Sequence, residues 1–303
     1  MKFSLWPDSG RSTDETLEVA RTADAAGWHG FWFADHYMAN TGDESVTAGD
    51  VHEVWSVLPA VAAVTESIRV GSLVSPTSVH HPAVLANRAT TLDHISHGRF
   101  VLGLGAGWQI NEHRAYGIVL EEPKVRVDRF EEAIQIIRSL LDDDRTTFEG
   151  AHYSITNAPS DPSPVQAKLP IVVGTSGRRM SRITAQHAQE WNTWGAPPSA
   201  EQKLGVFTDA CARVDVDAAS KHKSVQSLFM LTNDQSQIDD ALSGPRGEAT
   251  IAGSEEAVVD AIGRYADLGF DEVIVPDFVM GETAEDRRDA YARFTENIIP
   301  QFS

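Results

Sequence analysis

The chain has 303 residues, 42% of them hydrophobic, a formal net charge of −19 and one cysteine, Cys211. The charge argues against nucleic acid or an anionic membrane as a partner, and a single cysteine excludes an internal disulfide and fits a reducing cytosol. No run of about 18 apolar residues predicts a membrane span, and the first residues contain too few apolar side chains for a signal peptide. We therefore expect a cytoplasmic protein.

Apolar strand patterns alternate with helical patterns along almost the whole chain. Ser12 and Glu15 form a capping-box pattern before the first helix, and Gly27 ends it. Strands are expected at 3–6, 30–34, 68–74, 100–104, 171–173, 190–193, 225–231 and 270–275. The later helices are expected around Pro59, at 82–96, along 127–141, from about 177, and at 198–213, 254–269 and 284–299.

Eight strands alternating with helices predict an α/β fold of the (β/α)8 TIM-barrel type, as one domain over residues 1–303. A doubly wound open sheet is the alternative. Two long connections, 37–52 and 145–169, are expected as insertion loops at the carboxyl face, and residues 148–153 have a hairpin pattern.

The active site of such a barrel lies at the carboxyl ends of its strands. Asp35 and His36 follow the second strand, and a histidine there can exchange protons near neutral pH or simply hold the following loop. Trp6, Trp108 and Trp194 also fall near strand ends and are expected to wall a pocket for a planar group, whereas Trp191 fits either the pocket or the core. No metal site is expected, because the adjacent His80 and His81 point in different directions.

A phosphate site is expected where the fifth strand runs into a helix. Small residues expose backbone N–H groups there, and the helix turns its positive end toward them. An ordinary turn with a solvated arginine face is the alternative. The expected phosphate-binding residues are Gly174, Thr175, Ser176, Gly177 and Arg178, and Arg179 and Arg182 extend the basic cluster.

Three alternating glycines, Gly103, Gly105 and Gly107, end the fourth strand. Their G-x-G-x-G spacing differs from the G-x-G-x-x-G of dinucleotide-binding loops. Glycine weakens a strand, so we expect these positions to allow a flat ring to lie close to the backbone.

Several motifs together resemble the luciferase-like flavin and deazaflavin oxidoreductases. They are W-H-G-F-W-F-A-D-H at 28–36, V-G-S-L-V-S-P-T at 70–77, L-G-L-G-A-G-W at 102–108 with Asn111 and Glu112, and G-T-S-G at 174–177. The match covers nearly the whole chain and is nearest to the branch that uses coenzyme F420, a deazaflavin, judged by residues 34–43.

The resemblance implies an oxidoreductase that transfers a hydride between F420 and an organic substrate, often as a homodimer. It implies that His36 is the proton-transfer group and that Asn111 bonds the pyrimidine edge of the ring. Ser72 and Leu73 are implied to form a bulge behind the ring, which in this family often contains a non-proline cis peptide. Asp35 is implied to be a further cofactor-binding residue. The phosphate is assigned to residues 174–178.

One departure bears on the substrate. The sugar-phosphate dehydrogenases of the family carry an acid shortly after the strand-four glycines, where this chain has Trp108. An apolar or aromatic substrate is therefore expected. The alternatives are a monooxygenase using reduced FMN and O2, a non-catalytic barrel that binds or stores a flavin, and a barrel that holds a phosphorylated metabolite.

Overall fold

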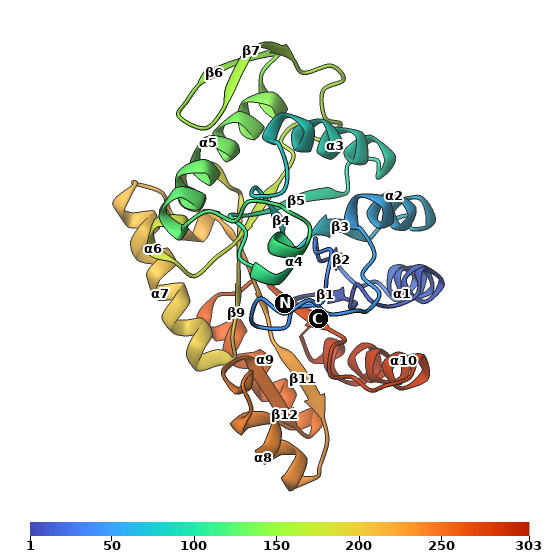
Figure 1. Cartoon of the computed structure of the whole chain (residues 1–303). Helices are drawn as coiled ribbons and strands as arrows, with labels where there is room; N and C mark the ends of the chain where they lie inside the picture. The colour runs from blue at the N-terminus through green and yellow to red at the C-terminus, as the bar shows by residue number, and fades with distance from the viewer. Residues whose placement is uncertain (303) are drawn as a thin grey trace.

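The computed structural model describes residues 1–302 and shows a closed barrel of eight parallel strands with helices around it (Figure 1). Successive strands pair in parallel, and the pairings β3 with β5 and β1 with β13 close the ring. The predicted (β/α)8 barrel is therefore confirmed, and the open-sheet alternative is wrong. The barrel strands are β1 (Lys2–Trp6), β2 (Gly30–Phe33), β3 (Arg69–Ser72), β5 (Phe100–Gly105), β8 (Ile171–Gly174), β9 (Glu190–Trp194), β10 (His222–Gln226) and β13 (Glu272–Pro276).

Helix α1 begins, and helix α9 ends, at a residue that the sequence supplies as a cap. The Ser12 side chain accepts a hydrogen bond from Glu15 N at 3.2 Å, and Gly269, at φ +86°, ends α9. Among the described residues, no helix combines the length and the hydropathy that a bilayer crossing requires. The helices are α1 (Thr13–Ala25), α2 (Val54–Val64, with Pro59 inside it), α3 (Pro82–Ile95), α4 (Ile110–Ala115), α5 (Pro123–Asp142), α6 (Arg178–His187), α7 (Pro197–Arg213), α8 (Gln235–Ser243), α9 (Glu255–Leu268) and α10 (Ala284–Arg293), which continues as a π-helical turn, Phe294–Ile298.

The predicted seventh strand, 225–231, is in fact two strands in two different sheets. The barrel strand β10 ends at Gln226, and β11 (Leu228–Leu231) pairs in parallel with β12 (Thr250–Gly253) outside the barrel. Ser227 separates them, and its buried hydroxyl lies 2.7 Å from the hydroxyl of Tyr265. Figure 1 shows β11, β12 and α8 projecting from one side of the barrel.

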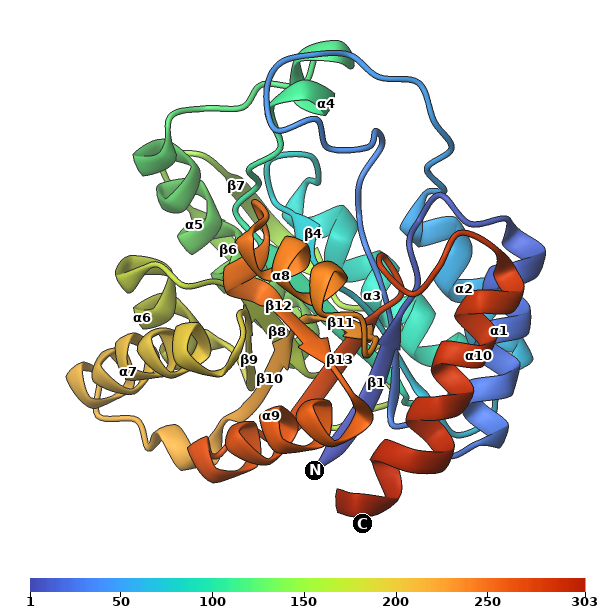
Figure 2. The same ribbon diagram turned by 90° about the horizontal axis from the view of Figure 1, so that it is seen from below.

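Both expected insertions are present, but only 37–52 lies at the carboxyl face; residues 145–169 run along the outer side of α5, and Gln166 bonds Phe100 O at the start of β5. Strands β6 (Arg145–Glu149) and β7 (Ser154–Pro159) form the predicted antiparallel hairpin, at the outer edge next to α5 (Figure 1). The loop 37–52 runs beside α4 at the carboxyl ends of the strands (Figure 2). A two-residue strand, β4 (Ser75–Pro76), pairs with β5 at the same end.

The core has two layers. A large layer fills the space between sheet and helices, and a smaller one fills the barrel interior around Trp32. Trp32 is 1% exposed, and a Cβ atom at Gly71 would lie 2.4 Å from its ring, so glycine is needed on β3 to admit the indole.

Candidate active site

His36 lies three residues beyond the end of β2, at the carboxyl end of the barrel. Its Nδ1 is 2.9 Å from Glu112 Oε1, and the backbone N–H of Tyr37 donates to Glu112 Oε2 at 2.8 Å. Glu112, on α4, is 1% exposed, while about a quarter of the His36 side chain is exposed. Nε2 has no hydrogen-bond partner within residues 1–302, so this nitrogen is the one available to a ligand. The sequence motif contained Glu112, but nothing in the motif indicated this role.

Trp108 lies against His36. The two rings meet edge to face, with centroids 5.7 Å apart, and the indole is 57% exposed. An exposed indole beside a histidine can contact a flat or apolar molecule on its free face.

Asp35 is turned inward. Its Oδ2 lies 2.8 Å from His80 Nε2 and accepts from Trp55 Nε1 at 3.2 Å. Burial raises the pKa of Asp35, but the hydrogen bond and charge of His80, helped by the hydrogen bond from Trp55, outweigh it and the net shift is downward. Asp35 therefore anchors the base of the His36 segment, and only its Oδ1 lacks a partner. Sequence reasoning missed the parts played by His80 and Trp55, which depend on contacts across 45 and 20 residues.

Asn111 holds the loop that follows β2. Its Nδ2 donates to Ala39 O at 2.8 Å, and nearby Gln109 Nε2 donates to Met38 O at 2.7 Å. Asn111 Oδ1 is buried without a partner. A buried acceptor left unpaired is costly unless a ligand or water supplies the donor.

The glycines at the end of β5 make room for protein rather than directly for a ring. A Cβ at Gly103 would lie 1.8 Å from Ser72 O, and one at Gly105 would lie 2.8 Å from Val74 Cγ2. Gly174 packs against Val74 as well, at 3.3 Å. The peptide bond between Leu73 and Val74 is cis. The expectation that these glycines face a ring is thus corrected, because the end of β3 fills the space beside them.

Two of the three expected pocket tryptophans meet. Trp6 and Trp194 have ring centroids 5.4 Å apart, and Phe278 lies 5.1 Å from Trp6. Leu73 and Val74 belong to the same apolar cluster. Trp191, for which both readings were open, is a core residue, fully buried and stacked on Phe207 at 4.6 Å.

The turn after β8 has the form expected of an anion-binding turn. Gly177 immediately precedes α6, and no side chain caps the helix. The N–H of Gly177 bonds Thr175 Oγ1 at 3.2 Å, and the first intrahelical bond runs from Ser181 N to Gly177 O. The N–H groups of Arg178, Arg179 and Met180, in the first turn of α6, are therefore free to donate to a ligand.

The basic cluster beside this turn is largely neutralised. Arg179 pairs with Asp128 and Glu131 of α5, and Arg182 lies 3.7 Å from Glu131. Within residues 1–302, Arg178 is exposed and forms no ion pair. Sequence reasoning missed the α5 acids, which lie 48 and 51 residues from Arg179. A hollow of about 270 Å³ here is lined by Arg178, Arg179, Arg182, Val206, Asp209, Ala210 and Arg213.

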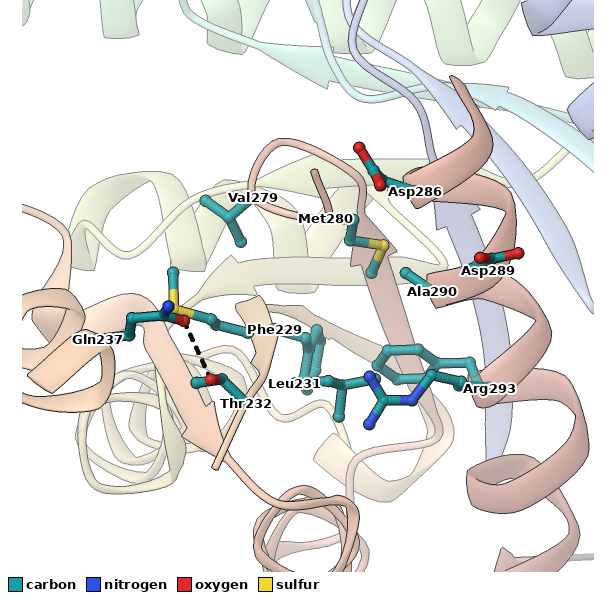
Figure 3. A pocket seen from close by; sticks show the side chains of 12 residues that line it. Phe229, Leu231, Thr232, Gln237, Val279, Met280, Asp286, Asp289, Ala290 and Arg293 are labelled. Carbon is teal, nitrogen blue, oxygen red and sulfur yellow. Dashed lines mark hydrogen bonds between the residues drawn. The ribbon is translucent and has the colours of Figure 1, made fainter. Parts of the chain in front are cut away.

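A second hollow, of about 340 Å³, lies between β11, the loop after β13 and α10 (Figure 3). Figure 3 shows Asp286 and Asp289 on α10 across from Phe229 and Leu231, with Thr232 bonded to Gln237. Neither hollow contains His36 or any of the expected tryptophans.

At the opposite, amino-terminal end of the strands lies a group with metal-ligand chemistry. Ligand atoms of His29, His222 and Glu272 lie within 4.8 Å of one another. Arg69 Nη1, however, is 3.2 Å from His29 Nε2 and 3.9 Å from Glu272 Oε2. The guanidinium already supplies the positive charge that a metal ion would bring to this group.

Comparisons with known proteins give matches over most of the chain. A family model described as luciferase-like monooxygenase matches residues 1–249. A relative from Microbacterium testaceum (strain StLB037), named F420-dependent glucose-6-phosphate dehydrogenase, is 27% identical over 95% of this chain and 93% of its own length.

Solved structures share the fold. An F420-dependent secondary alcohol dehydrogenase in complex with an F420-acetone adduct superposes with a TM-score of 0.83 at 17% identity, over all of both chains. The coenzyme F420 dependent tetrahydromethanopterin reductase from Methanopyrus kandleri gives 0.81 at 16% identity, over 100% of this chain and 99% of that one.

Proposed function

Because this chain belongs to the luciferase-like monooxygenase family, we propose that it is an F420-dependent oxidoreductase that moves a hydride between the deazaflavin and an organic substrate. One observation carries the proposal: a relative named for F420 dependence aligns with 95% of the chain. The family assigned from the motifs is confirmed by the family model.

The residues at the barrel mouth fit the cofactor. Asn111 Oδ1 is a buried acceptor without a partner, suited to a donor on the ring's polar edge. The free N–H groups at the start of α6 and the exposed Arg178 suit a phosphate. Ser72 and Leu73 would support the ring from the end of β3. When bound, the deazaflavin supplies the hydride chemistry, and the protein supplies position and proton transfer.

His36 is the group we assign to proton transfer. Its Nε2 is free while Nδ1 is held by Glu112, so Nε2 is the atom that takes or gives the proton. Asp35, bonded to His80 and Trp55, fixes the backbone from which His36 projects.

We propose an apolar or aromatic substrate, on the strength of Trp108, whose indole is 57% exposed next to His36. Glucose 6-phosphate is the second candidate, because it appears in the name of the Microbacterium relative. The alternative cofactor is FMN, which also presents a tricyclic ring and a phosphate, and the protein would then be a monooxygenase that uses reduced FMN.

The test has two parts. Titration of the purified protein with F420 and with FMN, followed by tryptophan fluorescence, should show tighter binding of F420; tighter FMN binding would favour the monooxygenase. Turnover is then measured with glucose 6-phosphate and with a panel of aromatic alcohols and ketones. Tight binding without turnover of any compound would favour a flavin-storing barrel.

We also propose a homodimer in a reducing, cytoplasmic environment. Sedimentation analysis of the purified protein tests the dimer, and fractionation of the source cells tests the compartment.

A further inference from the structure

We propose that Glu112 is a positioning residue that keeps the proton of neutral His36 on Nδ1, and so makes Nε2 the proton-accepting atom. The role in catalysis rests on the proposed function; the effect on the imidazole does not.

The geometry sets the direction of the bond. Glu112 Oε1 lies 2.9 Å from His36 Nδ1, and Glu112 Oε2 accepts from Tyr37 N at 2.8 Å. Each carboxylate oxygen thus faces one nitrogen. A carboxylate only accepts, whereas a neutral imidazole carries one donor and one acceptor nitrogen. The nitrogen that faces Glu112 must therefore carry the hydrogen, and the lone pair is left on Nε2.

A carboxylate is an expensive residue to bury for loop anchoring alone. Glu112 is 1% exposed, and removing a charge from water is unfavourable unless its partners compensate. The same loop is already tied down by uncharged amides, with Gln109 on Met38 O and Asn111 on Ala39 O. Glu112 adds a bond to the His36 imidazole, whereas the Gln109 and Asn111 amides bond only backbone oxygens of the loop.

The charge also acts during the reaction. When Nε2 accepts a proton from a substrate O–H or N–H, the ring becomes an imidazolium with hydrogens on both nitrogens. The Glu112 carboxylate, 2.9 Å from Nδ1, stabilises that positive charge. When the proton is returned, the ring regains its starting tautomer.

The matched variants are Glu112→Gln and Gln109→Ala. The side-chain amide in Glu112→Gln has one acceptor oxygen for two donors, so it must turn its NH2 group toward either His36 Nδ1 or Tyr37 N. Gln109→Ala removes an anchor of the same loop that does not touch His36. Glu112→Asp keeps the carboxylate and provides a conservative rescue.

The first measurement is the 15N NMR of the imidazole nitrogens, at mildly alkaline pH and without cofactor. The wild type and Gln109→Ala should carry the hydrogen on Nδ1, and Glu112→Gln should move population to the Nε2-protonated form. A wild-type hydrogen on Nε2, or no change in Glu112→Gln, would overturn the proposal. Because no cofactor is present, this result is independent of whether F420 is the natural one.

The second measurement is turnover. Glu112→Gln should lower kcat about 100-fold or more, as loss of a tautomer-fixing carboxylate does in other proton-transfer sites, with the Kd of F420 nearly unchanged. Glu112→Asp should recover part of the loss. Equal losses in Glu112→Gln and Gln109→Ala would instead make Glu112 a loop anchor only. If Glu112→Gln fails to fold, the comparison of Glu112→Asp with Gln109→Ala decides.

Discussion

At the amino-terminal end of the barrel, Glu272 pairs with both Arg69 and His222, whereas at the carboxyl end His36 and Asn111 each keep one polar atom without a partner within residues 1–302. The parallel strands place these two sets at opposite ends of the same cylinder. Glu272 is fully buried, and its carboxylate accepts from Trp32 Nε1 and lies 2.8 Å from His222 Nε2.

The difference indicates that the amino-terminal end of the barrel contributes to stability and the carboxyl end to ligand binding. Burial raises the pKa of Glu272, but the neighbouring His222 and Arg69 outweigh it and lower the pKa to about 2. These paired charges hold the strands together, and Arg69 of β3 also pairs with Glu190 of β9. The carboxyl end leaves Nε2 of His36 and Oδ1 of Asn111 free, as expected of a barrel's working face.

The largest effect is expected at the open end. His36→Ala should lower turnover about 100-fold or more, because it removes the proton-transfer group. The loss of unfolding free energy should be smaller than at the closed end, because Tyr37 N still donates to Glu112 and a quarter of the His36 side chain is already exposed. His94→Ala, on the exposed face of α3, is the matched control: it removes only an exposed hydrogen bond to Ser163 O, so turnover should be unchanged and the unfolding midpoint nearly so. Steady-state kinetics and urea unfolding give the two readouts. Unchanged turnover in His36→Ala would remove His36 from the reaction.

Glu272→Gln should show the reverse pattern at the closed end. Removing the charge takes the buried anion from His222 and one of two buried carboxylates from Arg69, which keeps Glu190, so the free energy of unfolding should fall by about 3 kcal/mol. Turnover per folded molecule should stay near that of the wild type. A fall in turnover without a loss of stability would contradict the separation of the two ends.

Gly103→Ala tests how tightly β5 packs against the end of β3 near the carboxyl end of the barrel. The new Cβ would lie 1.8 Å from Ser72 O, so we expect a loss of about 3 kcal/mol in unfolding free energy. Gly205→Ala, within α7 and with nothing within 4 Å, should instead gain about 0.5–1 kcal/mol. Urea unfolding of both variants checks the pair, and equal effects would show that the contact with Ser72 is unimportant.

The smallest effect is a pH dependence from His29 at the closed end. Burial, together with Arg69, Lys2 and His222, lowers the pKa of His29 from 6.5 to about 4, against the opposing charge of Glu272. Between these values the unfolded chain binds the extra proton, so stability is lost as the pH falls from 6.5 to 4. In His29→Gln, the loss of unfolding free energy between pH 6.5 and pH 4 should be smaller by about 2 kcal/mol, allowing for partial solvent screening. Urea unfolding at several pH values measures it; an unchanged slope would contradict the assignment.

Much of the fold could be predicted from the sequence because its signals are local. Ser12 caps α1 and Gly269 ends α9 through contacts within a few residues, and the apolar runs give the strand order. The break at Ser227 was not predictable, since 225–231 is an almost continuous strand pattern and the contact that accompanies the break is with Tyr265, 38 residues away.

The site was predicted less completely. His36 was identifiable from its place after a strand, but its partner Glu112 lies 76 residues further along the chain. The arginines after Gly177 formed a basic cluster in the sequence, while the acids that neutralise Arg179 belong to α5. Pairings between distant segments carry no periodic signal.

The glycines around Val74 have an evolutionary consequence. Gly105 and Gly174 are constrained by the Val74 side chain, but Gly103 is constrained by the backbone oxygen of Ser72. Alanine at 105 should therefore be tolerated in a chain that also carries alanine at 74, whereas no exchange of a neighbouring side chain makes room at 103. Among related sequences, substitutions at positions 74 and 105 should occur together, and position 103 should stay glycine.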